Sequence, residues 1–150
     1  MSPDVLSVMR GYPRIYFACH VEHRTRDRSV RGLTGREAGL LAHVTDPAGT
    51  GAGDLARHLG LAASTLSAAL GRLEGLGLIR LEADEGDARR RIVRLTDEGR
   101  AAVVEDSVLD AGRVERLLAT LDEEERGRAV SGLALLAEAA DRLRRAEGGA

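Results

Sequence analysis

Apolar side chains recur every three or four residues along most of the chain, a pattern that predicts amphipathic helices. The first helix is expected to begin at Ser2–Asp4, with a proline in its first turn. Gly11–Pro13 is expected to interrupt it, because Pro13 has no N–H to donate. A second helix then runs from Pro13 to about Asp27. One face of that helix carries Tyr12, Tyr16, Cys19 and His23.

The centre of the chain predicts two short helices joined by a tight turn. Thr34 and Glu37 have the spacing of a capping box, which predicts the start of a helix at this point. This helix comes before the pair of short helices in the chain. A short helix is then expected within Gly51–Gly60, and another from about Ala63 to Leu76. The glycine at position 60 supplies the turn, so the pair is expected to form a helix-turn-helix.

The pattern changes to strict alternation after this pair, which indicates strands over Leu78–Ala83 and Arg91–Leu95. The turn between them, Asp84–Arg91, is acidic first and then basic. Arginines gather at its end and in the second strand, at Arg89, Arg90, Arg91 and Arg94. A long helix is expected from Asp97 to about Ala119, and a last one from Asp122 to about Arg145.

The predicted fold is mainly α with a small β-hairpin, in a single domain covering residues 1–150. Residues 34–96 form a winged helix-turn-helix, and residues 1–33 and 97–147 supply flanking helices. The apolar faces of these flanking helices are too long for the small central core to cover. We therefore expect them to be dimerisation helices that pack against a second copy of the chain.

Composition narrows the class of protein. The hydrophobic share of 43% and the charged share of 31% are typical of a folded globular chain. The net charge of −2 gives no sign of a polyanion partner by itself, but a local basic patch can still attract one. The single cysteine rules out an internal disulfide, and no segment has the length of a membrane span. We expect a cytoplasmic protein without a membrane partner.

The chain carries no nucleophile elbow, no glycine-rich phosphate loop and no complete metal motif. It is therefore expected to be no enzyme and to need no cofactor. The basic hairpin beside a helix-turn-helix favours DNA as the partner. The alternative is a solvated hairpin whose arginines pair with Asp84, Glu85 and Asp87.

Five stretches resemble the MarR family of transcriptional regulators. They are Leu33-Thr34, LARHLGL at Leu55–Leu61, STLS at Ser64–Ser67, RLEGLGLI at Arg72–Ile79, and the wing pattern D-x-R-x-x-x-V-x-L-T at Asp87–Thr96. The wing pattern is the most specific of these. The resemblance implies a homodimer that binds double-stranded DNA at a palindromic operator. It also implies a repressor that is released by a small-molecule effector.

The resemblance assigns roles to single residues. Arg89 would enter a DNA minor groove, oriented by Asp87, because a narrow minor groove attracts arginine. Arg90 and Arg91 would add DNA contacts from the same hairpin. The recognition helix would offer Ser64, Thr65, Ser67 and Arg72 to the major groove, a small set for reading bases. Arg72 could equally form an ion pair within the fold. A winged helix that binds a protein instead of DNA stays an alternative.

Tyr12, Tyr16, Cys19, His20 and His23 form a separate candidate cluster, for an effector or a sensor. Three uses are open: lining a dimer interface or effector pocket, binding a metal, or sensing peroxide through Cys19. A metal site needs three or four ligands, and no fourth ligand accompanies the cysteine and the histidines. We therefore expect no metal, and the interface or pocket is the favoured use.

Overall fold

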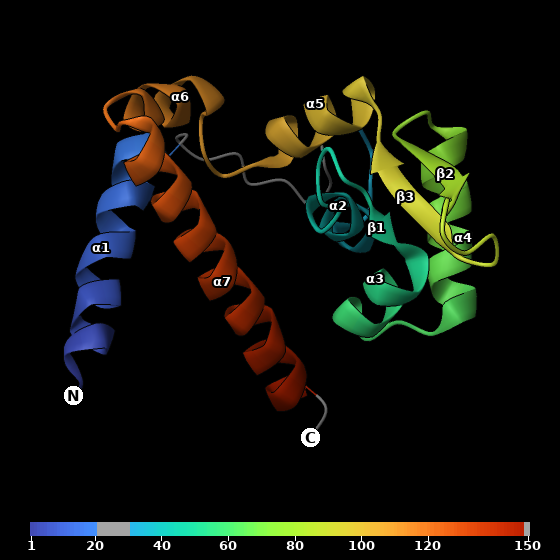
Figure 1. Cartoon of the computed structure of the whole chain (residues 1–150), viewed down its shortest axis with the longest axis horizontal. Coiled ribbons are helices and arrows are strands. Elements are labelled where there is room, and N and C mark those ends of the chain that lie inside the picture. The colour runs from blue at the N-terminus through green and yellow to red at the C-terminus, as the bar shows by residue number, and fades with distance from the viewer. Residues whose placement is uncertain (21–30, 149–150) are drawn as a thin grey trace. The chain divides into compact units, whose positions relative to one another are not determined.

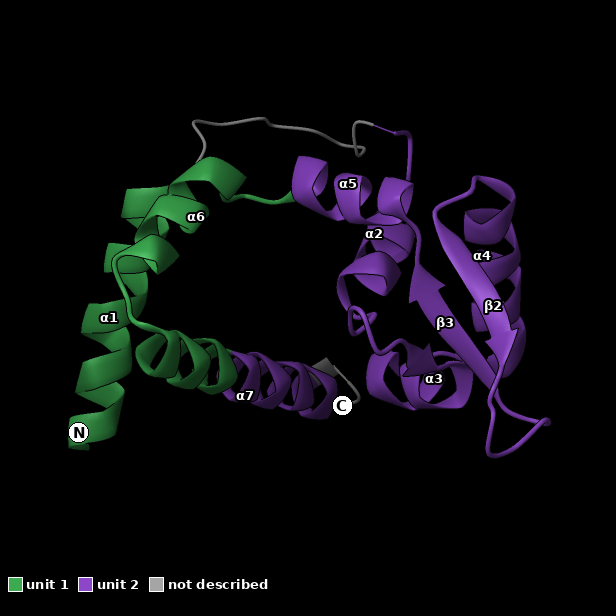
Figure 2. Cartoon of the chain, turned by 45° about the horizontal axis from the view of Figure 1, so that its top comes forward, with its two compact units in different colours: residues 1–26, 107–133 green, residues 27–106, 134–150 purple. Residues whose placement is uncertain are grey.

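The computed structural model describes residues 1–20 and 31–148. The chain forms two compact units (Figure 2). The helical unit comprises residues 1–26 and 107–133, and the winged unit comprises residues 27–106 and 134–150. No helix in the described ranges is long and apolar enough to cross a lipid bilayer.

The winged unit contains most of the secondary-structure elements (Figure 1). In chain order they are α2 (Gly35–Ala42), β1 (Thr50–Gly51), α3 (Ala52–Leu59), α4 (Ala63–Gly75), β2 (Ile79–Ala83), β3 (Arg91–Leu95) and α5 (Asp97–Asp106). The strands form an antiparallel sheet in the order β1-β3-β2, with Leu81 opposite Val93. The predicted winged helix fold is confirmed. β1 was not predicted, because two residues are too few to show an alternating pattern.

The core of the winged unit lies between the helix-turn-helix and the sheet. Leu66, Leu70 and Leu73 of α4 follow the i, i+4, i+7 spacing of one helical face and are all buried. They join a cluster with Leu33, Leu40, Leu41, Val44, Leu55, Leu78, Ile79, Val93, Leu95 and Ala102. Gly60 ends α3 in the left-handed conformation with φ of 64°, which glycine adopts without strain. The core thus sets the angle between α3 and α4.

The step from the sheet into α5 depends on one close approach. The Thr96 hydroxyl accepts from the backbone N–H of Gly99 and donates to the Gly77 carbonyl, 2.6 Å away. A Cβ atom at position 99 would lie 2.0 Å from the Leu78 carbonyl oxygen, closer than any real contact. Only glycine therefore allows α5 to start this near the end of the hairpin.

The helical unit contains α1 (Pro3–Cys19), α6 (Ala111–Ala119) and the beginning of α7 (Glu123–Gly148). α1 is continuous through Pro13, so the predicted interruption at Gly11–Pro13 is wrong. The φ angle of proline suits a helix, and the residue removes only one hydrogen bond. The bonds before and after it carry the helix across this position.

The predicted second helix does not reach Asp27. α1 ends at Cys19, and His20 is extended and pairs with Leu109 in an isolated antiparallel bridge. The Cys19 carbonyl accepts from the Asp110 N–H at 2.8 Å, so a bond to a distant segment replaces the next helical bond. The rest of the predicted helix, including His23, lies outside the described residues.

The predicted long helix from Asp97 to Ala119 is also wrong, because the chain leaves the helix after Asp106 and starts α6 at Ala111. The Asp110 carboxylate caps α6 by accepting from the Arg113 N–H at 2.8 Å. Aspartate is a strong N-cap residue. The cap was missed because the apolar positions on both sides of Asp110 continue with regular helical spacing. The structure thus gives α5 to the winged unit and α6 to the helical unit.

We expect Gly99→Ala to destabilise the winged unit by about 2 kcal/mol or more, because its Cβ atom cannot fit against the Leu78 carbonyl. Gly127→Ala is the matched control. A Cβ atom at position 127 in α7 meets nothing within 4 Å, so alanine should add up to about 1 kcal/mol through helix propensity. Urea unfolding followed by circular dichroism measures both. Equal stability of the two variants would contradict the packing argument.

Candidate nucleic-acid interface

The recognition helix α4 exposes a face of small side chains. Ser64, Ser67, Ala68 and Gly71 are exposed, on the side opposite the buried leucines, whereas Thr65 is half-buried. Ala62 stands at the N-cap, and no side chain in the described residues caps this helix. The first N–H groups of α4 are therefore open to an acceptor, which makes the helix start suitable for a phosphate oxygen.

The turn of the wing, between β2 and β3, is held by its own acidic residues. The Asp84 carboxylate accepts from the Gly86 N–H at 2.8 Å, and the Asp87 carboxylate accepts from the Arg89 N–H at 3.0 Å. The Asp87 carbonyl accepts from the Arg90 N–H at 2.9 Å. Asp87 thus shapes the backbone at Arg89, whereas the resemblance implied a bond to the Arg89 guanidinium. Figure 2 shows this turn projecting from the winged unit.

Two of the four hairpin arginines are used within the fold. The Arg90 guanidinium bonds to Asp54 of α3 and lies 3.6 Å from Asp84 of the wing. The Arg94 guanidinium donates to Glu82 across the hairpin and to the Pro47 and Ala48 carbonyls, each at 2.8 Å. These bonds connect the wing to the helix-turn-helix and to the loop before β1. The alternative that the hairpin arginines pair with acidic residues of the turn therefore holds for Arg90, which lies beside Asp84.

The other two hairpin arginines, Arg89 and Arg91, are exposed. Within the described part of the chain, neither guanidinium has an ion pair or a hydrogen bond. The wing therefore presents two unpaired positive charges, one on the hydrogen-bonded turn and one at the start of β3. Such an arrangement can contact a polyanion without first breaking an internal ion pair.

Arg72 has an internal partner. Its guanidinium donates to the carboxylate of Glu37, a buried residue whose exposed fraction is 6%. The same carboxylate oxygen accepts from the Thr34 N–H at 2.9 Å, and the Thr34 hydroxyl accepts from the Glu37 N–H at 3.2 Å. The predicted capping box is confirmed, and Arg72 ties it to α4. DNA contact by Arg72 stays a prediction, since half of its side chain is exposed.

Comparison with known proteins agrees with this geometry. A sequence model of the MarR family matches residues 31–90, the stretch from just before α2 to the end of the wing turn. This part of the chain is similar to the MarR family. The transcriptional activatory protein BadR of Rhodopseudomonas palustris is 35% identical in an alignment of 96 residues that covers 61% of this chain. The match spans 55% of the length of BadR.

Two solved structures share the fold of most of the chain. A probable transcriptional regulator from Pseudomonas aeruginosa is 26% identical, with a TM-score of 0.51 over 88% of this chain and 96% of that one. A crystal structure of MarR is 24% identical, with a TM-score of 0.53 over 96% of this chain and 97% of that one. The match therefore extends beyond the helix-turn-helix to the flanking helices.

The predicted effector or sensor cluster lies in the helical unit. The Tyr12 and Tyr16 rings stack at 6.4 Å, and the Tyr16 and His20 rings stack at 4.5 Å. Cys19 is a free thiol with 1% of its surface exposed, which leaves a peroxide little access to its sulfur atom. His23 lies outside the described residues. The use of this cluster by an effector or a sensor stays a prediction.

Sequence reasoning missed Asp54 as a contributor to the interface. Asp54 is 36 positions away from Arg90, and acidic residues in a first helical turn are usually explained by the helix dipole. Only the packing of β3 beside α3 brings the two side chains together. No local signal could have indicated this pair.

The buried ion pair gives a pH prediction. The Arg72 guanidinium holds the pKa of Glu37 below its ordinary value of 4.5, against burial, which raises it. Because this pKa is lower in the folded chain, the carboxylate adds stability above pH 4.5 that is lost as the pH falls below that value. We expect Glu37→Gln to cost about 2 kcal/mol at pH 7 and progressively less in acid.

Urea unfolding at several pH values measures this difference. Glu124→Gln is the control, since Glu124 forms only an exposed pair with Arg128 at 4.0 Å. The control should stay within about 0.5 kcal/mol of the original chain at every pH. A Glu37→Gln deficit that is independent of pH would show that the charge is not what stabilises the contact.

Proposed function

We propose that this chain is a DNA-binding transcriptional regulator of the MarR family that works as a homodimer on a palindromic operator. The observation that carries the proposal is the pair of unpaired guanidinium groups, Arg89 and Arg91, on a wing anchored to the helix-turn-helix. A guanidinium group without an internal partner can contact DNA without first losing an ion pair. The activity is binding and does not require a catalytic group.

The recognition helix and the wing would divide the work of binding. The open N–H groups and the Ser64 and Ser67 hydroxyls at the start of α4 would contact phosphates and base edges of the major groove. Arg89 would enter the adjacent minor groove, and Arg91 would contact the backbone beside it. Arg90 would contribute indirectly, by holding the wing against Asp54 of α3.

Sequence selectivity would depend strongly on DNA shape. Ala68 and Gly71 occupy the exposed middle of α4, and neither has a side chain that can form hydrogen bonds with a base. Arginine in a narrow minor groove responds to groove width, which varies with base sequence. The operator is therefore expected to contain AT-rich segments where the two wings contact it.

The homodimer is supported by the apolar surface of the flanking helices. α1 exposes Val5, Leu6, Val8, Met9, Tyr12, Ile15 and Phe17. α7 exposes Val130, Leu133, Leu135, Leu136 and Leu143. Apolar side chains at such density on two helices are typical of a surface that another chain covers. A two-fold dimer would also present two recognition helices about one DNA turn apart, near 34 Å.

The proposed regulation is repression that ends when a small molecule binds. The stacked rings of Tyr12, Tyr16 and His20 support an effector site for a planar or aromatic molecule in the helical unit. The relative BadR is named as an activator, so the sign of regulation is best measured directly. A reporter gene behind the operator would rise without the chain if it represses and fall if it activates.

We expect Arg89→Ala to weaken binding to the DNA upstream of the chain's own gene by about tenfold, or 1–2 kcal/mol. The dependence of affinity on salt should become shallower by about one phosphate equivalent or less. Arg91→Ala should weaken binding less, since it would lose a phosphate contact alone. Fluorescence anisotropy at several salt concentrations measures both effects.

Arg128→Ala is the matched control for charge, because Arg128 is an exposed arginine of α7 outside the wing. It should bind the operator as the original chain does. If Arg89→Ala and Arg128→Ala bind equally well, the wing is not a DNA contact. Salt-insensitive or absent binding by the original chain would favour the protein-binding alternative.

We expect the chain to have twice its 16.0 kDa mass in solution, and Phe17→Asp to shift it toward monomer. Phe17 is 75% exposed on α1, and a carboxylate there would be desolvated in a dimer interface. Light scattering after size-exclusion chromatography measures the mass. Leu76→Asp, at an exposed leucine of the winged unit, is the control and should leave the dimer intact. A monomeric original chain would refute the dimer.

A further inference from the structure

Two histidines and an aspartate from distant parts of the sequence meet within the winged unit. His43 follows the last residue of α2, His58 belongs to α3, and Asp141 belongs to the part of α7 in this unit. The Nε2 atoms of His43 and His58 lie 2.9 Å and 3.3 Å from the same Asp141 oxygen, Oδ2. All three potential ligand atoms lie within 4.8 Å of one another.

The protonation of His43 is set by its other ring nitrogen. The Nδ1 atom of His43 lies 2.6 Å from the Gly39 carbonyl oxygen. A carbonyl only accepts, so Nδ1 carries the proton, and in the neutral ring Nε2 has a free lone pair. That lone pair faces a carboxylate, which is unfavourable unless a proton or a metal cation lies between them. A histidine whose Nδ1–H is held by a backbone carbonyl is a common arrangement for a metal ligand.

The three side chains are only partly exposed to solvent. His43, His58 and Asp141 are 20%, 33% and 21% exposed, so the cluster is partly shielded and still reachable from solvent. A carboxylate oxygen beside two imidazole nitrogens is a set of donor atoms that suits Zn²⁺.

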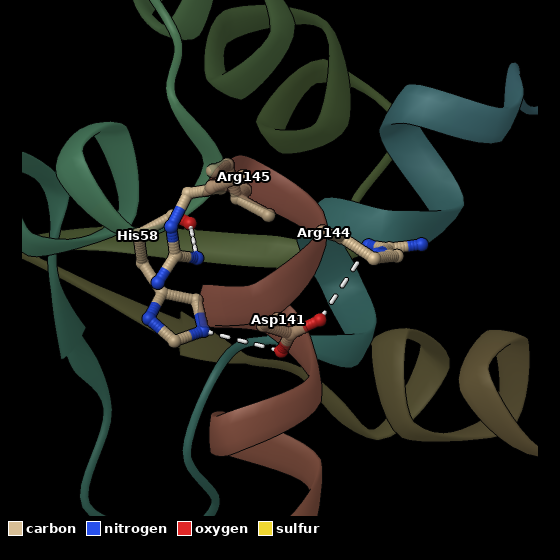
Figure 3. A pocket seen from close by; sticks show the side chains of 5 residues that line it. His58, Asp141, Arg144 and Arg145 are labelled. Carbon is tan, nitrogen blue, oxygen red and sulfur yellow. Dashed lines mark hydrogen bonds and ion pairs between the residues drawn. The ribbon is translucent and has the colours of Figure 1, made fainter. Parts of the chain in front are cut away.

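A pocket of about 300 Å³ adjoins the cluster and is lined by His58, Leu59, Asp141, Arg144 and Arg145 (Figure 3). The view shows His58 and Asp141 directed toward one another. Arg145 is engaged by the His58 backbone carbonyl, and Arg144 makes only a long contact of 3.5 Å with the other Asp141 oxygen. The pocket leaves room for a fourth ligand, and the two arginines would favour water as hydroxide or a small anion.

We propose that His43, His58 and Asp141 form a zinc site that joins α7 to α2 and α3 within the winged unit. Two imidazole nitrogens and one carboxylate oxygen are a donor set that Zn²⁺ binds tetrahedrally, with a fourth position left open. Zinc ligands in such a site are about 3.4 Å apart, so side-chain movements of about an ångström complete the geometry. The site is distinct from Cys19, His20 and His23, and binding of zinc does not depend on DNA binding.

Titration of the metal-free full chain with zinc chloride in a calorimeter tests the proposal. We expect one Zn²⁺ per chain and a rise in the unfolding temperature, because the metal binds only the folded arrangement. Asp141→Asn keeps the shape of the side chain and removes its charge, and it should weaken zinc binding by at least about tenfold. His58→Ala should also weaken zinc binding by at least about tenfold. It serves as the test variant if Asp141→Asn folds poorly.

Cobalt absorption gives a second readout, since Co²⁺ bound tetrahedrally by nitrogen and oxygen absorbs visible light strongly. The original chain should show this band, and Asp141→Asn and His58→Ala should lose it. The double variant His20→Ala, His23→Ala is the matched control and should keep both the zinc stoichiometry and the cobalt band. Absence of zinc binding, or equal affinity in the original chain and the two site variants, would overturn the proposal. Loss of zinc binding in the control with retention in the site variants would also overturn it.

Discussion

The position of the recognition helix depends on the buried carboxylate of Glu37. One oxygen of this group accepts from the Thr34 N–H, which starts α2, and from Arg72 near the end of α4. An ionised group at 6% exposure is tolerable only because both contacts are made, and either partner alone would leave a charge insufficiently compensated. The contact therefore joins the beginning of one helix to the last turn of another. The leucines of α4 supply the driving force for packing, and this ion pair selects the orientation in which they pack.

The arginines of the wing divide into two kinds for a related reason. A hairpin of two short strands is marginal by itself and needs contacts to the rest of the fold. Arg90 and Arg94 supply these contacts through Asp54, Glu82 and two backbone carbonyls. Because those arginines hold the hairpin, Arg89 and Arg91 are not needed for its internal contacts. The DNA contact proposed for Arg89 and Arg91 thus depends on the internal bonds of Arg90 and Arg94, which hold the wing in place.

The two candidate ligand sites differ in how far apart their residues lie in the sequence. The Tyr12, Tyr16 and His20 stack lies within a few turns of one helix, and its chemistry was visible in the order of the residues. The His43, His58 and Asp141 cluster combines the C-cap residue of α2 with residues of α3 and α7, and Asp141 lies 83 positions beyond His58. Zinc there would add a cross-link between helices in a unit whose core is built mainly from leucine. A metal clamp and the Glu37 ion pair would then restrain α2 at opposite ends.

Local signals in the sequence determined most of the elements of the winged unit. The capping box at Thr34 and Glu37, the glycine turn at Gly60 and the alternating runs of the hairpin each act within a few residues, and each is confirmed. The same reasoning failed at Pro13 and at Asp110, where a continuous helix and a broken one have similar apolar spacing. The end of α1 at Cys19 could not be predicted, because a backbone bond from Asp110 replaces the next helical bond. Tertiary structure alone likewise decided which hairpin arginines are free and which histidines meet an aspartate. These pairings depend on distances between segments, which the order of residues does not specify.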